Sequence, residues 1–371
     1  MPDSVGVIIF AGGTQPDHPL LQAMQDVRYA CAIDLMQRAL EAACFNPIVI
    51  VTNDRAWANS IGDRPVTIDL DDETDQFHFG RRFAEVIDRY RLDRVLYMGA
   101  ASAPLLLVAD LQQIGEKVRQ SDRVVIANNI NSTDWAAINP ASIVHDWIDR
   151  LPSDNSLGWV LSHDAGLTPI SWSPSPATRL DVDVPIDAQI AVLHSQCGLH
   201  LQATVQALGW NTDRLRAVRE VLKTPATRVI LAGRVPSWAM AQMEKSTQCW
   251  TRVYSEERGM RAAGRLGAGQ VRSLLNDHLQ AVGLEHFIAE LNSMADAILW
   301  DTRVLWAARG VWPTEVERYA ADLGMVNDIA DPFLRDFTQA INEASIPIVT
   351  GGHALVSGGL WTLLEAMNNE Q

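Results

Sequence analysis

The sequence predicts a two-domain α/β protein whose first domain has three layers, with helices on both faces of a mostly parallel sheet. Three observations lead to this expectation. The 371 residues suffice for about two domains, and 47% of them are hydrophobic, which is enough for packed cores. Continuous apolar runs alternate with segments of helical periodicity, as is typical of buried parallel strands and their crossover helices. The alternation loosens in the middle of the chain and restarts near residue 228, which predicts a second, smaller α/β domain.

The first domain is expected over residues 1–205 and contains four apolar runs that predict strands. These strands are Val5–Phe10, Pro47–Thr52, Arg94–Met98 and Arg123–Ala127. Apolar residues at helical spacing predict helices between and after the strands, at Tyr29–Ala43, Phe79–Arg91, Leu106–Gln120 and Ile186–Leu208. Pro169–Pro176 is rich in proline and serine, which predicts a loop.

A helical connector and linker over residues 206–227 is expected to join the domains, with a helix at Asp213–Leu222 and a linker at Lys223–Thr227. The second domain, residues 228–371, resumes the alternation. Its expected strands are Arg228–Ala232, Trp250–Tyr254, Ala297–Trp300 and Pro347–Thr350. Its expected helices are Val271–Val282, Glu285–Met294, Pro313–Leu323 and Pro332–Ala344.

Composition excludes several classes of function. The formal net charge of −15 argues against a protein that coats nucleic acid, because neutralising phosphates needs clustered Lys and Arg, although a small phosphorylated ligand stays possible. The four cysteines lie far apart without a CxxC pair, so neither a zinc ribbon nor a disulfide framework is expected. No stretch approaches the roughly 18 apolar residues of a membrane span. We therefore expect a cytoplasmic protein without membrane or nucleic-acid partners, and homo-oligomers stay possible.

Four short motifs follow one another along the first domain, each after a predicted strand or before a predicted helix. They are Ala11-Gly12-Gly13-Thr14, Ser102-Ala103-Pro104-Leu105-Leu106, Asn128 to Ser132, and Asp181-x-Asp183-x-Pro185. A strand that ends in small residues lets a ligand approach the backbone, whose N–H groups can hold phosphate. In this order, over about residues 5–195, the motifs resemble those of GT-A-like nucleotidyltransferases. The molybdenum-cofactor nucleotidyltransferases and the phospholactate guanylyltransferases are the most similar by eye.

The resemblance implies a reaction and a set of roles. The family transfers a nucleoside monophosphate from a nucleoside triphosphate to a small phosphorylated or acidic metabolite and releases pyrophosphate, with Mg²⁺ neutralising phosphate charge. Carried over by position, the implied roles are nucleotide binding by Ala11, Gly12, Gly13, Thr14 and Arg28, acceptor binding by Asn128, Asn129 and Ser132, Mg²⁺ binding by Ser102 and Asp183, and catalysis by Asp183.

The chain departs from the family pattern at two positions. The family's loop continues to an Arg and a Lys that meet the triphosphate, whereas here neither residue type occurs before Arg28, which leaves His18 or Arg28 to substitute. Ser102 stands where the family has a metal-binding Asp, and a neutral hydroxyl is a weaker Mg²⁺ ligand. Asp181 and Asp183 can be explained equally well without a metal, as negative charges that complement the N-terminus of the following helix. Three hypotheses stay open: an active transferase, a degenerate scaffold that binds without turnover, and a domain that only supports assembly.

Polar residues and glycines follow all four strands expected in the second domain. They are Arg234, Glu256, Arg258, Asp301, Arg303, Gly351, Gly352 and His353. The carboxyl ends of parallel strands meet at one edge of a sheet, where ligands bind, and arginine suits phosphate or carboxylate. We therefore expect an anion site here, with His353 as a general acid or base oriented by Asp301 or Glu256. Ion pairs at strand ends, a capping His353 and close glycine packing explain the same residues without a ligand.

Overall fold

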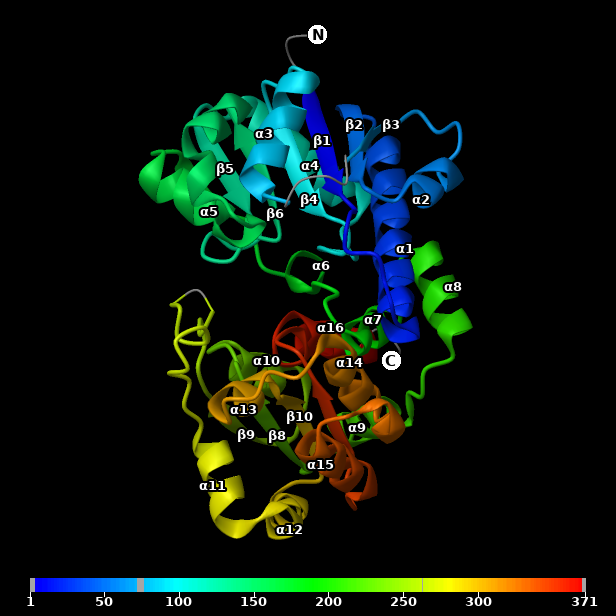
Figure 1. Cartoon of the computed structure of the whole chain (residues 1–371), viewed down its shortest axis with the longest axis vertical. Helices are drawn as coiled ribbons and strands as arrows, with labels where there is room; N and C mark the ends of the chain where they lie inside the picture. Colours follow the sequence, from blue (N-terminus) through cyan, green and yellow to red (C-terminus); the bar gives the residue numbers. More distant parts are fainter. Residues whose placement is uncertain (1–3, 72–76, 262, 369–371) are drawn as a thin grey trace. The chain divides into compact units, whose positions relative to one another are not determined.

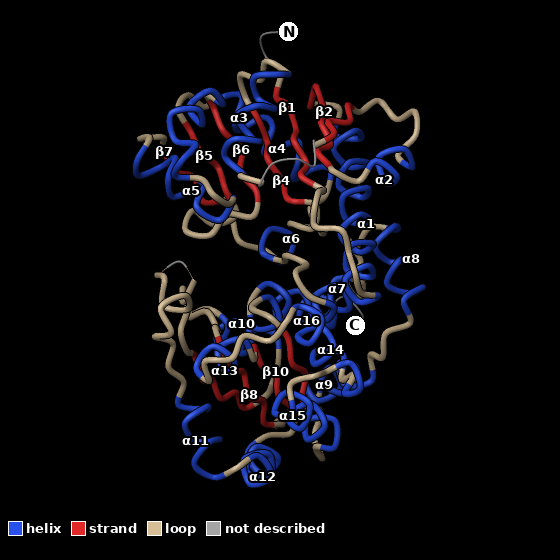
Figure 2. Tube along the Cα trace, in the orientation of Figure 1, coloured by secondary structure: helices blue, strands red, loops and turns tan. Residues whose placement is uncertain are grey.

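The computed structural model describes residues 4–71, 77–261 and 263–368 of the chain (Figure 1). The chain divides into two compact units. The first unit contains Met1–Gln15, Gln25–Asp181 and Gly198–Thr204; the second contains Pro16–Met24, Val182–Cys197 and Val205–Gln371. Each unit has its own sheet (Figure 2). The predicted fold class is therefore confirmed: a mixed α/β chain with a mostly parallel sheet and a second, smaller sheet.

The sheet of the first unit has seven strands in the order β3-β2-β1-β4-β6-β5-β7. Their bounds are β1 Val5–Phe10, β2 Phe45–Thr52, β3 Thr67–Leu70, β4 Val95–Gly99, β5 Val124–Ala127, β6 Trp135–Asn139 and β7 Thr168–Ser171. All neighbouring strands pair in parallel except β6, which runs antiparallel to both β4 and β5. The carboxyl ends of β1 and β4 therefore lie side by side, with Phe10 opposite Gly99.

Helices and 3₁₀ segments accompany this sheet in the chain order. The helices are α1 Pro19–Ala42, α2 Arg55–Ser60, α3 Phe79–Arg89, α4 Val108–Gln120, α5 Leu157–Trp159, α6 Pro176–Arg179 and α8 Leu199–Leu208. The buried face of α3, together with the 3₁₀ segment Ala141–Arg150, packs on alternate residues of the central strands and forms one core. The core positions the strand ends because close-packed side chains leave little room for movement.

The sheet of the second unit has four parallel strands in the order β11-β10-β8-β9. Their bounds are β8 Arg228–Gly233, β9 Trp250–Ser255, β10 Ala297–Asp301 and β11 Ile348–Gly351. The helices of this unit are α7 Pro185–Ala191, α9 Asp213–Lys223, α10 Ala239–Ser246, α11 Leu274–Val282, α12 Leu284–Met294, α13 Arg303–Ala308, α14 Glu315–Leu323, α15 Pro332–Glu343 and α16 Gly358–Asn368. None of the helices in the described ranges combines the length and the apolar character needed to cross a membrane.

Two expectations about local structure were wrong. The segment Ile186–Leu208 forms two helices, α7 and α8, instead of one, because the carboxylate of Asp34 accepts hydrogen bonds from the backbone N–H groups of His200 and Leu201 and starts a new helix there. The segment Pro169–Pro176 is not all loop, because its first residues belong to strand β7 at the edge of the sheet.

Candidate functional site

The connection order of the first sheet marks one place where a ligand can bind. From β1 the chain continues to β2 and β3 on one side, and then returns to place β4 on the other side of β1. In open α/β sheets, ligands bind at such a reversal, outside the carboxyl ends of the two flanking strands. The loop that begins at Ala11 and the turn around Ser102 follow β1 and β4 at this point.

The loop after β1 is held by hydrogen bonds at some backbone groups and leaves others available. Ala11 is buried, and its N–H donates to the carbonyl of Val51 at 2.8 Å. The N–H of Gly13 donates to Asn53 Oδ1 at 3.1 Å, and Asn53 Nδ2 donates to the Gly13 carbonyl at 2.7 Å. Within the described part of the chain, the N–H groups of Gly12 and Thr14 have no partner, and both residues are exposed. The loop therefore offers backbone donors to solvent.

The two glycines of this loop are explained by close neighbours. A Cβ atom at Gly12 would lie 3.2 Å from Asn53 Oδ1, and one at Gly13 would lie 3.1 Å from Oε1 of the buried Gln25. Sequence reasoning missed both Asn53 and Gln25. The signal for Asn53 is its position directly after the apolar run of β2, at the same edge of the sheet as the loop.

The two candidate cations for a triphosphate have partners of their own. Arg28, on α1, is half-buried and interacts within the chain. His18 accepts a hydrogen bond through Nδ1 from the N–H of Leu20, at the beginning of α1. Neither observation tests the predicted role of Arg28, which stays a prediction.

The residues predicted to bind Mg²⁺, Ser102 and Asp183, belong to different units. Ser102 is buried in the first unit, where its hydroxyl donates to the Gly99 carbonyl at 2.9 Å, and its backbone forms a bridge with Asp181. Asp183 is exposed in the second unit, and its carbonyl accepts a hydrogen bond from Tyr319 at 3.1 Å. The described residues contain no group of three or more His, Cys, Asp and Glu that could hold a metal. The binding of Mg²⁺ by Ser102 and Asp183 that the resemblance implied stays a prediction.

The residues predicted to bind an acceptor shape the connection between β5 and β6. Asn128 is buried, donates to Asp134 Oδ2 at 2.5 Å and accepts from the Asp134 N–H at 3.1 Å. Asn129 Oδ1 accepts from the backbone two residues later, and the exposed Ser132 donates to Asn155 Oδ1 at 3.1 Å. The structure thus brings these residues together in one turn, where Asn128 has a structural role.

A cluster of charged groups around Tyr97 was not predicted. The hydroxyl of the buried Tyr97 donates to Asp154 Oδ2 at 2.7 Å. Burial raises the pKa of this tyrosine, and Asp154, Asp134 and Asp181 raise it further. Burial lowers the pKa of Arg179, with Asp134 opposing, and the buried Nε of Arg179 has no hydrogen-bond partner among the described residues. The cluster places an arginine among carboxylates near the β5–β6 connection.

Two arginine–aspartate pairs involve residues of the anion site predicted in the second unit. Arg234 contacts Asp301 through Nε–Oδ2 at 2.6 Å and Nη2–Oδ1 at 3.1 Å, and Asp301 is fully buried. Arg303 contacts Asp322 through Nη1–Oδ1 at 2.9 Å and Nη2–Oδ2 at 2.5 Å, and both side chains are buried. Arg303 is therefore occupied by Asp322, which sequence reasoning missed because 19 residues separate the two.

The other predicted residues of this unit have mixed surroundings. Gly351 and Gly352 are buried; a Cβ atom at Gly351 would lie 2.6 Å from Ile186, and one at Gly352 would lie 3.7 Å from Val184. Glu256 accepts hydrogen bonds from the Ser273 hydroxyl and the Leu274 N–H, both at 2.8 Å, at the beginning of α11. Gly351, Gly352 and Glu256 thus make contacts within the fold. Arg258 and His353 are exposed.

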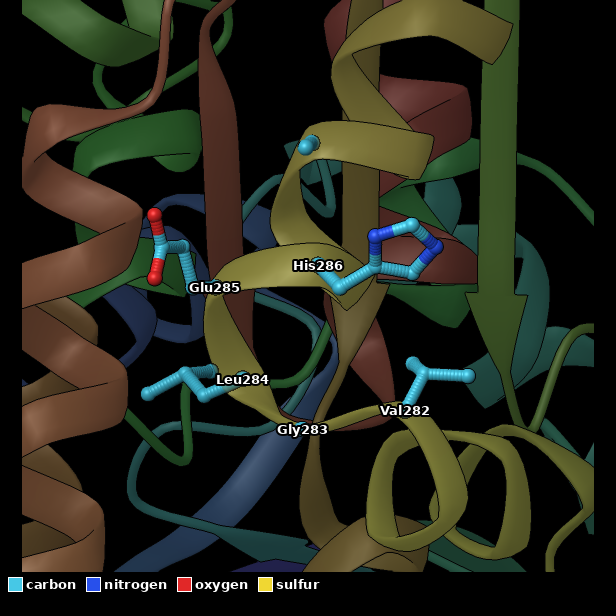
Figure 3. A pocket seen from close by; sticks show the side chains of 6 residues that line it. Val282, Gly283, Leu284, Glu285 and His286 are labelled. Atoms are coloured by element: carbon cyan, nitrogen blue, oxygen red, sulfur yellow. The ribbon is translucent and has the colours of Figure 1, made fainter.

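A surface hollow of the second unit lies at the beginning of α12. Its lining residues are Val282, Gly283, Leu284, Glu285, His286 and Ala289, none of which belongs to the predicted sites. The Glu285 carboxylate and the His286 ring point to opposite sides of helix α12 (Figure 3). The two groups therefore do not converge on a common ligand.

Comparison with known proteins gives likenesses only among solved structures. No family model matches the sequence, and no curated protein matches it. A nucleotide-diphospho-sugar transferase candidate from Desulfovibrio desulfuricans is 13% identical, with 55% of this chain and 97% of that chain covered and a TM-score of 0.40. A cytidylyltransferase from Leptospira borgpetersenii is 14% identical (56% and 94% covered, TM-score 0.37), and a nucleotidyl transferase from Methanothermobacter is 15% identical (49% and 92%, TM-score 0.35). These values describe a likeness in fold over about half of the chain.

Proposed function

We propose that the first unit binds a nucleoside triphosphate at the carboxyl ends of β1 and β4. We also propose that the chain transfers the nucleoside monophosphate to a small phosphorylated or acidic metabolite. One observation carries the proposal: the exposed loop at the reversal of the strand order has N–H groups of Gly12 and Thr14 without a partner in the described ranges. Backbone N–H groups at such a position suit phosphate oxygens.

The support from neighbouring residues concerns the shape of the loop. Asn53 binds both backbone groups of Gly13, and Gln25 lies against the same glycine, so the loop keeps its conformation before a ligand arrives. A preformed loop favours binding because less conformational entropy is lost when the ligand is bound. The order of the four sequence motifs, together with the strand order that carries them, supports a nucleotide as this ligand.

Arg179, the cation of the charged cluster, supports an acidic acceptor. Arg179 lies close enough to Asp134 for the carboxylate to affect its pKa, and its Nε has no partner among the described residues. In the proposed reaction an oxygen of the acceptor attacks the α-phosphorus. The bond from that phosphorus to the bridging oxygen breaks, and pyrophosphate leaves with the electron pair. A phosphate or carboxylate oxygen is already ionised near pH 7, so this attack needs no general base.

A second candidate function, binding of a nucleotide without turnover, is favoured by the turn after β4. The polar side chain of this turn, Ser102, is neutral, and its hydroxyl donates a hydrogen bond to the Gly99 carbonyl. A hydroxyl in this state supplies no negative charge to a metal–phosphate complex. Under this alternative the nucleotide binds at the same loop and no pyrophosphate is released.

The experiment compares nucleotide binding and pyrophosphate release with the full chain. Calorimetric titration with ATP, GTP, CTP and UTP in Mg²⁺ buffer should show binding of at least one nucleotide. A Gly12→Val variant should weaken that binding by about tenfold or more, because the branched side chain fills the space beside Asn53, and lost contacts of about 1.4 kcal/mol equal a factor of ten.

The matched control is Ala109→Val, which adds the same branched side chain at an exposed position of α4. This variant should bind as tightly as the original chain. Binding that is equally strong in all three proteins would contradict the proposed site. Binding with no pyrophosphate release, across phosphorylated and carboxylic acceptors, would select the second candidate.

A further inference from the structure

We propose that the second unit carries a separate phosphate-binding site, formed by Arg234, Arg258 and His353 at the carboxyl ends of its strands. The site takes the phosphate group of a small metabolite. This inference does not rest on the proposed nucleotide transfer, because its residues all belong to the second unit.

The connection order of the second sheet also contains a reversal. From β8 the chain continues to β9 on one side, and later returns to place β10 on the other side of β8. The carboxyl ends of β8 and β10 therefore flank the position where open parallel sheets bind ligands. Arg234 directly follows β8, and Asp301 is the last residue of β10.

Asp301 orients the guanidinium of Arg234 and leaves part of it available. The carboxylate accepts from Nε and Nη2, so three of the five N–H donors of Arg234 have no partner in the described part of the chain. Gly233 permits this contact: its φ is +103°, and a Cβ atom there would lie 2.4 Å from the Asp301 carbonyl oxygen. The outer edge of an arginine held in this way can donate two parallel hydrogen bonds to phosphate.

The loop after β9 presents Arg258 to solvent. The two residues before this arginine are held in place, because Glu256 accepts hydrogen bonds at the beginning of α11 and Glu257 accepts from Arg265 Nε at 2.8 Å. The side chain of Arg258 is exposed and makes no hydrogen bond or ion pair with the described residues. Its charge is therefore not neutralised by a neighbour, in a chain whose formal net charge is −15.

The charges of both arginines act on the side chain of His353. Burial lowers its pKa to about 4, Arg234 and Arg258 act in the same direction, and Asp301 opposes them. His353 keeps an exposed surface, which weakens the effect of burial, but both guanidinium groups still favour the neutral ring near pH 7. A bound phosphate would reverse this field and raise the pKa of His353.

The number of hydrogen-bond donors favours phosphate over a carboxylate. Asp301 compensates Arg234 and Asp322 compensates Arg303, so the charge of Arg258 is left for the ligand. Three residues offer donors from different strand ends, and phosphate has three terminal oxygens and up to two charges, whereas a carboxylate has two oxygens and one charge. Arg303 and Glu256 lie outside the proposed site because Asp322 and the beginning of α11 occupy them.

The experiment uses the full chain and inorganic phosphate, with acetate as the carboxylate probe. Calorimetry should show that phosphate binds more tightly than acetate at equal ionic strength. An Arg258→Gln variant should raise the Kd for phosphate by about tenfold or more, since a hydrogen bond to a charged group is lost. The matched control, Arg216→Gln, changes an arginine on α9 whose side chain is 70% exposed, and should leave the Kd unchanged.

A second measurement reads the histidine directly. Titration of the ring protons by NMR, with His353→Asn to assign the signal, should show a higher pKa for His353 when phosphate is present. The proposal is overturned if Arg258→Gln and Arg216→Gln weaken binding equally, or if phosphate leaves the pKa of His353 unchanged. Phosphate binding that disappears in Gly12→Val and survives in Arg258→Gln would place the anion in the first unit and would also overturn it.

Discussion

Loss of the carboxylate in the Arg303–Asp322 pair should strongly destabilise the second unit. Arg303 is 5% exposed and Asp322 is fully buried, and two hydrogen bonds join them. The pKa of Asp322 is raised, because the effect of burial exceeds the opposing effect of Arg303. The pKa of Arg303 is also raised, because Asp322 outweighs the lowering effect of burial. We take the pair as ionised because only a carboxylate accepts from both nitrogens of the guanidinium.

The magnitude follows from this burial. Asp322→Asn leaves a buried guanidinium without its counter-charge, which costs about 3–5 kcal/mol, equivalent to roughly 6–20 °C in Tm for a unit of this size. Differential scanning calorimetry of the full chain should show this shift. Glu220→Gln serves as the control, since its partner Lys223 lies 3.4 Å away at the surface, and it should change stability by less than about 0.5 kcal/mol.

A double replacement tests the physical reason. Arg303→Met combined with Asp322→Leu removes both charges and should recover most of the lost stability, because no uncompensated charge stays buried. The reasoning is refuted if Asp322→Asn shifts the Tm no more than Glu220→Gln does, or if the double replacement is less stable than the single one.

Two further predictions concern pH and the nucleotide loop. Because the pKa of His353 is lowered to about 4, the unfolded chain binds a proton that the folded chain does not between about pH 4 and the ordinary histidine pKa of about 6.5, so stability should rise with pH across this window. Urea unfolding at several pH values should show that the free energy of unfolding rises less steeply with pH in His353→Asn than in the original chain. An equal rise with pH in both proteins would contradict the prediction. Asn53→Ala removes both hydrogen bonds to Gly13 and should weaken nucleotide binding measured by calorimetry without a large change in the urea midpoint. Unchanged affinity would show that Asn53 does not prepare the loop.

Much of the fold could be predicted because apolar runs identify buried strands. The expected strand Val5–Phe10 coincides with β1, and Arg228–Ala232 differs from β8 by one residue. The strands β3 and β7 were missed because they are short and partly exposed, and Thr168–Ser171 even contains a proline at the sheet edge. Strand β6 was missed although it is buried, because Trp135–Asn139 is short and directly follows the polar segment that contains Asn128 and Ser132.

The candidate sites were predictable only where neighbours in sequence are also neighbours in space. The glycines after β1 carry a local signal, whereas their partner Asn53 is 40 residues away. Likewise, Ser102 forms a backbone bridge with Asp181, which lies far from it in the sequence. Such contacts depend on which distant segments of the chain pair with each other. A short sequence motif carries no information about that pairing.

Hydrogen exchange of the full chain with and without the best-bound nucleoside triphosphate tests the proposed nucleotide site most directly. The measurement reports backbone N–H groups, which are the groups proposed to hold the phosphates. Protection by the nucleotide at residues 11–15 and 99–103, together with unchanged exchange at residues 255–261, is the predicted result. Protection confined to residues 255–261, or no protection after β1 and β4, would contradict the account.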